Sequence, residues 1–411
     1  MPILRASLLI LLATPVIGLC QTDSKAAKDL IQVHAVVTDR QGQLVYGLTV
    51  DDFLLKEDSL LPVLHSFRME QIETRAGGLL SPKAGTAGGS SRADSGESVR
   101  PTISRVIALL VDTSGISHGG MESVKAALLR FVDEQTTDRD VLALMTTAGK
   151  PGVAGEFTTD RGKLRERIKK LHSGQVWTES FLTPALCGKV MRRQAEAVTL
   201  ATQIIQSEEY TTGSLIAGES SDPLAEASSK CMMLLLEAAT RRRAATSSIR
   251  AATERLAGIP GQRIVALFSE GFSMTAPGGE VAIADVRPAM SGAVHAGVMV
   301  YTLDARVALD TKPINIGSFH LSSEMNDAVR DYQHGMALLA SQTGGEAFFN
   351  IDGLSDCLQK MLNNNRICYH FEYSAPQNKN PGDYRNITVL VKNHPEYRVR
   401  APKGYALAVG P

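Results

Sequence analysis

Residues 104–117 read SRVIALLVDTSGIS, and this stretch decides the fold of the chain. The segment from Val106 to Val111 is an unbroken apolar run, which is typical of a strand buried on both faces in the middle of a parallel sheet. The run ends at Asp112, and a polar turn containing Ser114 and Ser117 follows it. Open α/β sheets bind ligands at the carboxyl ends of their central strands, so this turn is a candidate binding site. Its carboxylate and hydroxyl oxygens suit a hard cation, Mg²⁺ or Ca²⁺.

Strands and helices alternate on the carboxyl side of this stretch, which predicts a doubly wound, mostly parallel sheet within residues 101–365. Apolar periodicity indicates strands at 141–147, 263–268, 297–303 and 346–349. It indicates helices at 121–135, after the capping residue Asp160, at 327–341 and at 354–362. Residues 173–262 interrupt the alternation, and we interpret them as a helical insertion or a lengthened helical arm, with helical stretches near 184–207 and 223–256.

Two β-rich segments flank this domain, at residues 21–72 and 366–411. Strands are expected at 31–38, 44–46, 53–56 and 62–69, and again at 368–373, 384–391, 397–400 and 405–409. Four short strands alone would leave open edges, so we expect the two segments to pair into one small β-sandwich. Residues 73–100 are rich in Gly and Ser and are expected to be a flexible linker.

The first 20 residues have the pattern of a secretory signal peptide. Arg5 precedes an apolar run from Ala6 to Leu19, which is too short to span a bilayer comfortably. A lipoprotein anchor at Cys20 is the second interpretation, because Leu19 stands where lipoprotein signals have a small residue. No later segment is apolar and long enough to span a membrane, so we expect a periplasmic or extracellular protein.

Four cysteines remain after the signal segment, which in an oxidising compartment permits two disulfides. Proximity in sequence favours Cys357 with Cys368, which leaves Cys187 with Cys231. Four buried free thiols are an alternative of similar weight. Neither pair has the spacing of a zinc site.

Charge and motifs exclude several function classes. The chain has 43 basic and 43 acidic residues, so no net field attracts it to nucleic acid or to an anionic membrane. No HExxH pair and no P-loop is present in the sequence. Residues 115–119 match GxSxG, which would make Ser117 a nucleophile, but three residues separate this motif from the strand end. We therefore expect a protein that is not an enzyme, with an exported hydrolase as a third hypothesis.

Several stretches together resemble the secreted bacterial family of von Willebrand factor A (VWA)-related proteins. They are VTDRQGQLVYGLTVDDFLLKED, VIALLVDTSG, RIVALFSEGF, AGVMVYTLDAR, LLASQTGGEAFFN and VRAPKGYAL, in this order along the chain. The resemblance implies a VWA domain, with its Rossmann-like sheet, set between N- and C-terminal β segments.

The resemblance also implies a metal-ion-dependent adhesion site, in an altered form. Asp112 and Ser114 match the first two positions of the family's Asp-x-Ser-x-Ser motif, whereas Ile116 occupies the third and Ser117 follows it. Glu270 stands where the family has an aspartate. Thr178 and Thr183 are weak matches for the family's ligating threonine. The expected metal ligands are Asp112, Ser114, Ser117 and Glu270, with Mg²⁺ or Ca²⁺ as cofactor; the alternative is that Asp112 and Ser114 only stabilise the turn.

The resemblance therefore predicts an exported protein that binds a protein ligand, through a shared divalent cation completed by the partner's carboxylate. The competing hypothesis is a metal-independent structural or assembly protein of the cell envelope, which Ile116 and Glu270 favour.

Overall fold

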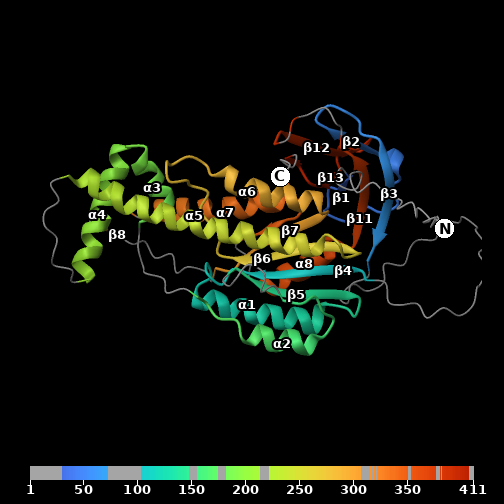
Figure 1. The fold of residues 1–411 in the computed structure, drawn as a ribbon, viewed down its shortest axis with the longest axis horizontal. Helices are drawn as coiled ribbons and strands as arrows, with labels where there is room; N and C mark the ends of the chain where they lie inside the picture. The colour runs from blue at the N-terminus through green and yellow to red at the C-terminus, as the bar shows by residue number, and fades with distance from the viewer. Residues whose placement is uncertain are drawn as a thin grey trace, which may run out of the picture.

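The computed structural model describes residues 30–72, 103–147, 155–174, 182–212, 222–306, 315–316, 319–320, 322–349, 353–375, 380 and 382–406 (Figure 1). The expected signal peptide with Cys20, and the expected linker at 73–100, lie outside these ranges. Within the described ranges, no helix is long and apolar enough to cross a bilayer.

A five-stranded parallel sheet forms the centre of the fold, as the alternation of strands and helices predicts. Its order is β10-β7-β6-β4-β5. The strands are β4 (Arg105–Val111), β5 (Asp140–Thr146), β6 (Gln262–Ser269), β7 (Val298–Asp304) and β10 (Ala347–Phe348). All seven residues of β4 are buried, because helices cover both faces of the sheet.

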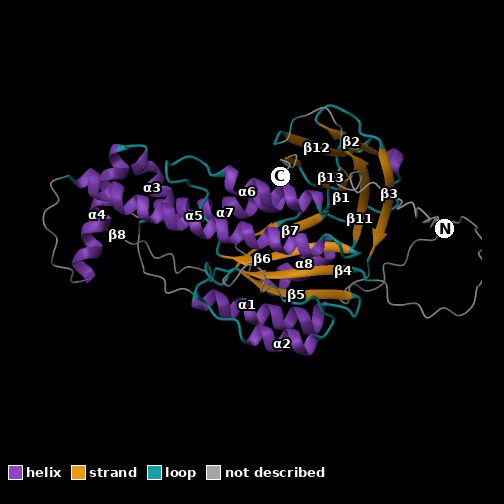
Figure 2. Ribbon diagram, viewed as in Figure 1, coloured by secondary structure: helices purple, strands orange, loops and turns teal. Residues whose placement is uncertain are grey.

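Helices pack on the two faces of this sheet in two layers (Figure 2). Ile107, Leu109 and Val111 of β4 share a core with α1 (His118–Arg130), α2 (Arg161–Lys169) and α8 (Leu354–Asn364). The alternate residues Val106, Ala108 and Leu110 share the opposite core with α5 (Pro223–Leu256), α6 (Ile283–His295) and α7 (Ser322–Gln342). A π-helical turn, Phe131–Gln135, extends α1, and Asp160 caps α2 as predicted. The prediction missed α6, which contains Pro288.

A helical arm extends beyond the sheet and is built from α3 (Pro184–Met191), α4 (Ala195–Thr212) and the first half of α5 (Figure 1). The helical stretch predicted near 184–207 consists of two helices, because the chain breaks after α3 and Arg193 adopts a positive φ of 57°. A small hairpin, β8 (Asn315–Ile316) with β9 (Phe319–His320), also belongs to the described chain.

Cys187 and Cys231 form a disulfide that joins α3 to α5 inside this arm. The expected bond between Cys357 and Cys368 was wrong, since both are buried free thiols. Cys357 lies on α8 and Cys368 on a strand of the sandwich, so closeness in sequence did not bring them together in space.

The flanking segments pair into a β-sandwich, which confirms the predicted association of the two ends of the chain. One sheet has the order β13-β1-β11-β3 and the other β14-β12-β2, all antiparallel. The strands are β1 (Leu30–Thr38), β2 (Phe53–Glu57), β3 (Leu64–Gln71), β11 (Ile367–Ser374), β12 (Tyr384–Val391), β13 (Arg398–Arg400) and β14 (Gly404–Ala406). A short 3-10 turn, Val50–Asp52, precedes β2. The expected strand at 44–46 was wrong: Leu44 makes only an isolated bridge with Thr38.

The sandwich core contains residues from both sheets and also Val294 of α6. Phe53 of β2 packs edge-on against Phe371 of β11, with ring centroids 5.0 Å apart. Because α6 packs on β7 of the parallel sheet and also covers β1 and β14, the sandwich packs directly on the parallel-sheet domain.

Candidate functional site

The predicted site lies where the winding of the parallel sheet reverses. The chain runs from β4 outward to β5, and then from β6 through β7 to β10 on the other side. The carboxyl ends of β4 and β6 are therefore the topological switch point at which open α/β sheets bind ligands. Asp112 follows β4 and Glu270 follows β6, and the backbone N–H of Asp112 donates a 2.9 Å hydrogen bond to the carbonyl of Phe268. The structure thus places the two predicted carboxylates at neighbouring strand ends.

Three hydroxyl groups converge on the buried carboxylate of Asp112. Its Oδ1 accepts hydrogen bonds from Thr147 at 2.8 Å and from Ser114 at 3.1 Å. Its Oδ2 accepts one from Ser269 at 2.7 Å. The Ser114 and Thr147 hydroxyls are also only 3.2 Å apart. These four side chains come from the ends of three adjacent strands, and we call them the Asp112 cluster.

Gly115 is required by this arrangement. A Cβ at this position would lie 2.2 Å from Oδ2 of Asp112, far closer than any real contact. Any other residue would therefore push the carboxylate away from its hydroxyl partners or move the turn.

Ser117 and Glu270 form a second pair beside this cluster. Glu270 Oε1 accepts hydrogen bonds from the Ser117 hydroxyl at 2.6 Å and from the Ser117 backbone N–H at 2.9 Å. The same hydroxyl oxygen accepts the N–H of Gly120 and so caps α1. Glu270 therefore lies at the positive end of the α1 dipole. Within the part of the chain that the structure describes, the Ser117 hydroxyl bonds the Glu270 carboxylate and the Gly120 N–H, and neither group is the imidazole that activates the serine of a Ser-His-Asp triad.

Burial raises the pKa of Glu270, and the nearby carboxylate of Asp304 adds to this effect. The hydrogen bonds from Ser117 and the charge of Arg306 oppose it. Asp304 itself forms an ion pair with Arg306 at 2.9 Å and accepts a hydrogen bond from Gln333. Burial thus destabilises the ionised form of Glu270 unless a cation or further hydrogen-bond donors lie beside it.

The structure revises the set of candidate ligands. Ile116 is fully buried in the core beneath α1, so the third motif position contributes packing only. Thr178 lies outside the described residues, and Thr183 caps α3 by accepting the N–H of Leu186. Thr147 and Ser269 were missed by the sequence reasoning. Each stands at the end of a predicted strand next to β4, which is the signal that could have identified them.

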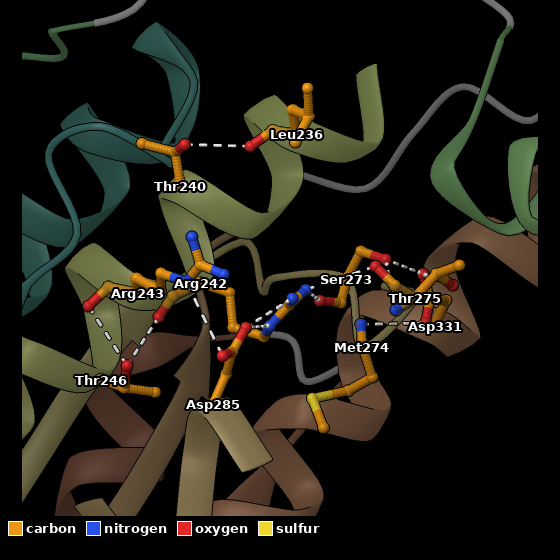
Figure 3. Close-up of polar contacts among 10 residues, drawn as sticks. All are labelled: Leu236, Thr240, Arg242, Arg243, Thr246, Ser273, Met274, Thr275, Asp285 and Asp331. Atoms are coloured by element: carbon orange, nitrogen blue, oxygen red, sulfur yellow. Dashed lines mark hydrogen bonds and ion pairs between the residues drawn. The ribbon is translucent and has the colours of Figure 1, made fainter. Parts of the chain in front are cut away.

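The loop after Glu270 is held by two groups of polar contacts, one made by Asp331 and one by Arg242 (Figure 3). Asp331 of α7 accepts hydrogen bonds from the Ser273 hydroxyl, from Met274 N at 3.1 Å and from the Thr275 hydroxyl at 3.3 Å. Arg242 of α5 donates to the Ser273 carbonyl at 2.7 Å and pairs with Asp285 at 2.7 Å. Helices on one face of the sheet thereby fix the loop that carries Glu270.

A separate pocket of about 460 Å³ lies beside this loop. It is lined mainly by charged and polar side chains of α3, α7 and the 274–281 loop, among them Lys189, Glu280, Asp327, Asp331 and His334. None of the four predicted site residues lines it.

The Asp112 cluster offers one carboxylate and three hydroxyls, which is an oxygen-only donor set of the kind that Mg²⁺ and Ca²⁺ accept. Asp112, Ser114 and Thr147 fit such a cation, because their oxygens already converge at the edge of the sheet. Ser117 and Glu270 bond each other instead.

Comparison with known proteins agrees with this architecture. Residues 107–211 match the model of the von Willebrand factor type A domain. No curated protein matches the chain. A similar solved structure is described as an aerotolerance-related membrane protein from Bacteroides fragilis NCTC 9343 with multiple mutations to serines. It is 11% identical, with 64% of this chain and 99% of that chain covered and a TM-score of 0.26, and this low similarity supports no functional inference. The family match and the five-stranded sheet together show that the chain contains a von Willebrand factor type A domain.

Proposed function

We propose that this chain is an exported protein-binding module, not an enzyme, which recognises its partner at the edge formed by the carboxyl ends of β4 and β6. The Asp112 cluster carries this proposal: a buried carboxylate and three hydroxyls meet at the switch point of the sheet. Domains of the VWA family commonly mediate protein interactions, which agrees with this assignment.

The cluster would hold a divalent cation, Mg²⁺ or Ca²⁺, through Asp112, Ser114 and Thr147. Three protein oxygens leave coordination positions for water and for a carboxylate of the partner. Such a shared cation makes binding specific for an acidic side chain, because the cation attracts the carboxylate and fixes its direction.

Export is supported by two observations. The segment from Ala6 to Leu19 after Arg5 has the pattern of a secretory signal, and the Cys187–Cys231 disulfide is of a type that persists in oxidising compartments. We therefore place the module in the periplasm or outside the cell.

A metal-independent structural or assembly protein is the second candidate. It is favoured by Ile116, which cannot ligate, and by Ser117, whose hydroxyl already bonds Glu270. Calorimetric titration with Mg²⁺, Ca²⁺ and Mn²⁺ separates the two candidates. The first predicts heat of binding that is absent in Asp112→Ala; the second predicts no heat at millimolar metal and no change in melting temperature.

A further inference from the structure

A polar patch covers the face of the first sandwich sheet that points away from the sandwich core. Along β1 and β11, the residues Val33 and Phe371 point into that core, whereas His34 and His370 alternate with them and point outward. His34 is paired directly with His370, and Cys368 is paired with Glu70 of β3. Three adjacent strands thus bring two imidazoles and a thiol to one spot, with the Glu70 carboxylate in contact with His370.

The ligand atoms of His34, Cys368 and His370 are close together, and most of the imidazole nitrogens lack a hydrogen-bond partner. One ligand atom from each of His34, Cys368 and His370 lies within 4.8 Å of the others, and all three residues are at most 4% exposed. Nδ1 of His34 and both ring nitrogens of His370 are buried with no hydrogen-bond partner. Buried imidazole nitrogens without partners are unfavourable, because they lose water and gain nothing in return.

The contact between His370 and Glu70 has the geometry of two metal ligands rather than that of a hydrogen bond. His370 Nε2 and Glu70 Oε2 are 2.8 Å apart, yet neither atom has a partner by hydrogen-bond geometry. A hydrogen bond would require the ring N–H to point at the oxygen. Two ligands of one metal ion instead point at the ion, and in a tetrahedral zinc site they lie about 3.3 Å apart, given metal–nitrogen distances of about 2.0–2.1 Å.

We propose that His34, Cys368, His370 and Glu70 form a structural zinc site. Thiolate, imidazole and carboxylate are the ligands that Zn²⁺ takes, and four of them complete its tetrahedral shell. Mg²⁺ and Ca²⁺ are excluded by the nitrogen and sulfur ligands. The burial of all three core ligands leaves no open position for substrate, so the site is structural rather than catalytic.

Burial and the surrounding charges determine the protonation states of the proposed ligands. Burial holds the pKa of His34 well below its usual value, and the charges of His370, Arg263 and Arg68 add to this effect, so the imidazole is neutral. Burial and the charge of Glu70 raise the pKa of Cys368 to about 12, so zinc binding would release the thiol proton to solvent. The thiolate and carboxylate then neutralise Zn²⁺, which avoids a net positive charge beside the two arginines.

The site lies at the junction of the sandwich and the parallel-sheet domain. Gln262, at the start of β6, lies beside Cys368. Gly297, between α6 and β7, passes so close that a Cβ there would lie 3.2 Å from Nε2 of His34. A zinc ion would therefore tie β1 and β3, from the N-terminal segment, to β11, from the C-terminal segment, underneath the VWA domain.

The first test is metal content of the full chain after exposure to Zn²⁺ and removal of excess. We expect one zinc per chain by mass spectrometry, and affinity reduced at least ~10-fold in His34→Ala and His370→Ala, since even the groups that orient zinc ligands contribute that much. His65→Ala, an exposed histidine on β3, is the matched control and should bind zinc normally. Asp112→Ala should also keep its zinc, which separates this site from the proposed cation site.

Cobalt substitution identifies the sulfur ligand without relying on a destabilised variant. The Co²⁺ form should show a thiolate-to-cobalt charge-transfer band in the near ultraviolet. Because Cys187 and Cys231 are in a disulfide, persistence of this band in a variant that carries both Cys20→Ser and Cys357→Ser assigns it to Cys368. A folded chain that binds no zinc at micromolar concentration, or a cobalt complex without a sulfur band, would overturn the proposal.

Discussion

Thr147, at the end of β5, donates a 2.8 Å hydrogen bond to Oδ1 of Asp112, at the end of β4. This contact joins two neighbouring strand ends and places a hydroxyl where a cation bound to Asp112 would need one. We therefore predict that Thr147→Val weakens binding of Mg²⁺ or Mn²⁺ by about tenfold or more, by analogy with the loss of a group that supports a metal site. Isothermal titration measures the change. Thr199→Val, which removes an exposed hydroxyl on α4, should bind metal as the unsubstituted chain does; equal affinities for the two variants would contradict the role of Thr147.

Glu270 gives a prediction about pH. Its pKa is raised in the folded chain, so between the unfolded and folded pKa values the folded state binds more protons, and stability falls as the pH rises. In Glu270→Gln this loss disappears, while the amide oxygen can still accept both hydrogen bonds from Ser117. Urea unfolding in the presence of chelator, from pH 4 upward, should show the variant gaining stability relative to the parent as the pH rises. A stability difference independent of pH would show that Glu270 is not strained by burial.

Burial also raises the pKa of Asp331, but this residue is present in both the parent and the Glu270→Gln variant. Its contribution therefore cancels in the comparison of Glu270→Gln with the parent.

Glu57 provides a test of how the sandwich is joined. Its carboxylate accepts a 2.6 Å bond from Arg385 and a 3.0 Å bond from the Tyr405 hydroxyl, and it is 2% exposed. Glu57→Ala would leave the arginine buried without its main partner, which in other proteins costs about 3–5 kcal/mol. Glu134→Ala, which breaks an exposed pair with Arg130, should have little effect in the same urea unfolding experiment. A small loss in Glu57→Ala would mean that the two ends of the chain do not depend on this contact.

Removal of the Cys187–Cys231 disulfide should lower the stability of the helical arm. Cys187 and Cys231 close a loop with a sequence separation of 44, and a crosslink of this kind stabilises by about 2–4 kcal/mol. The double variant Cys187→Ser with Cys231→Ser should lose this amount in chemical unfolding, and reductant should lower the stability of the parent but not that of the variant. If peptide mapping finds both thiols free in the native chain, the assignment of the disulfide fails.

The parallel sheet could be predicted from sequence because its signals are local. Buried runs such as that from Val106 to Val111 and the periodicity of the helices are properties of short segments. The break between α3 and α4 was not predicted, since the left-handed conformation of Arg193 has no signal at an arginine. The helix α6 was missed because Pro288 suggests an interruption, although its helix continues.

The candidate site was only partly predictable for a related reason. Asp112 and Ser114 lie in one motif, whereas Thr147 and Ser269 join them only when the strand order is known. The cluster of His34, Cys368 and His370 shows the same difficulty more strongly. Its members sit at opposite ends of the chain, and only the pairing of β1 with β11 brings them together. The expected bond between Cys357 and Cys368 failed because sequence proximity says nothing about which face of a strand or helix a thiol occupies.

The most direct test of the proposed function is a count of bound Mn²⁺ by electron paramagnetic resonance, in which the free ion gives a signal that binding broadens. The measurement compares the parent chain, preloaded with zinc, with Asp112→Ala under the same conditions. We predict one bound Mn²⁺ per parent chain and none in the variant, with both proteins folded by circular dichroism. Equal binding in the two proteins, or none in either, would contradict a cation site at Asp112.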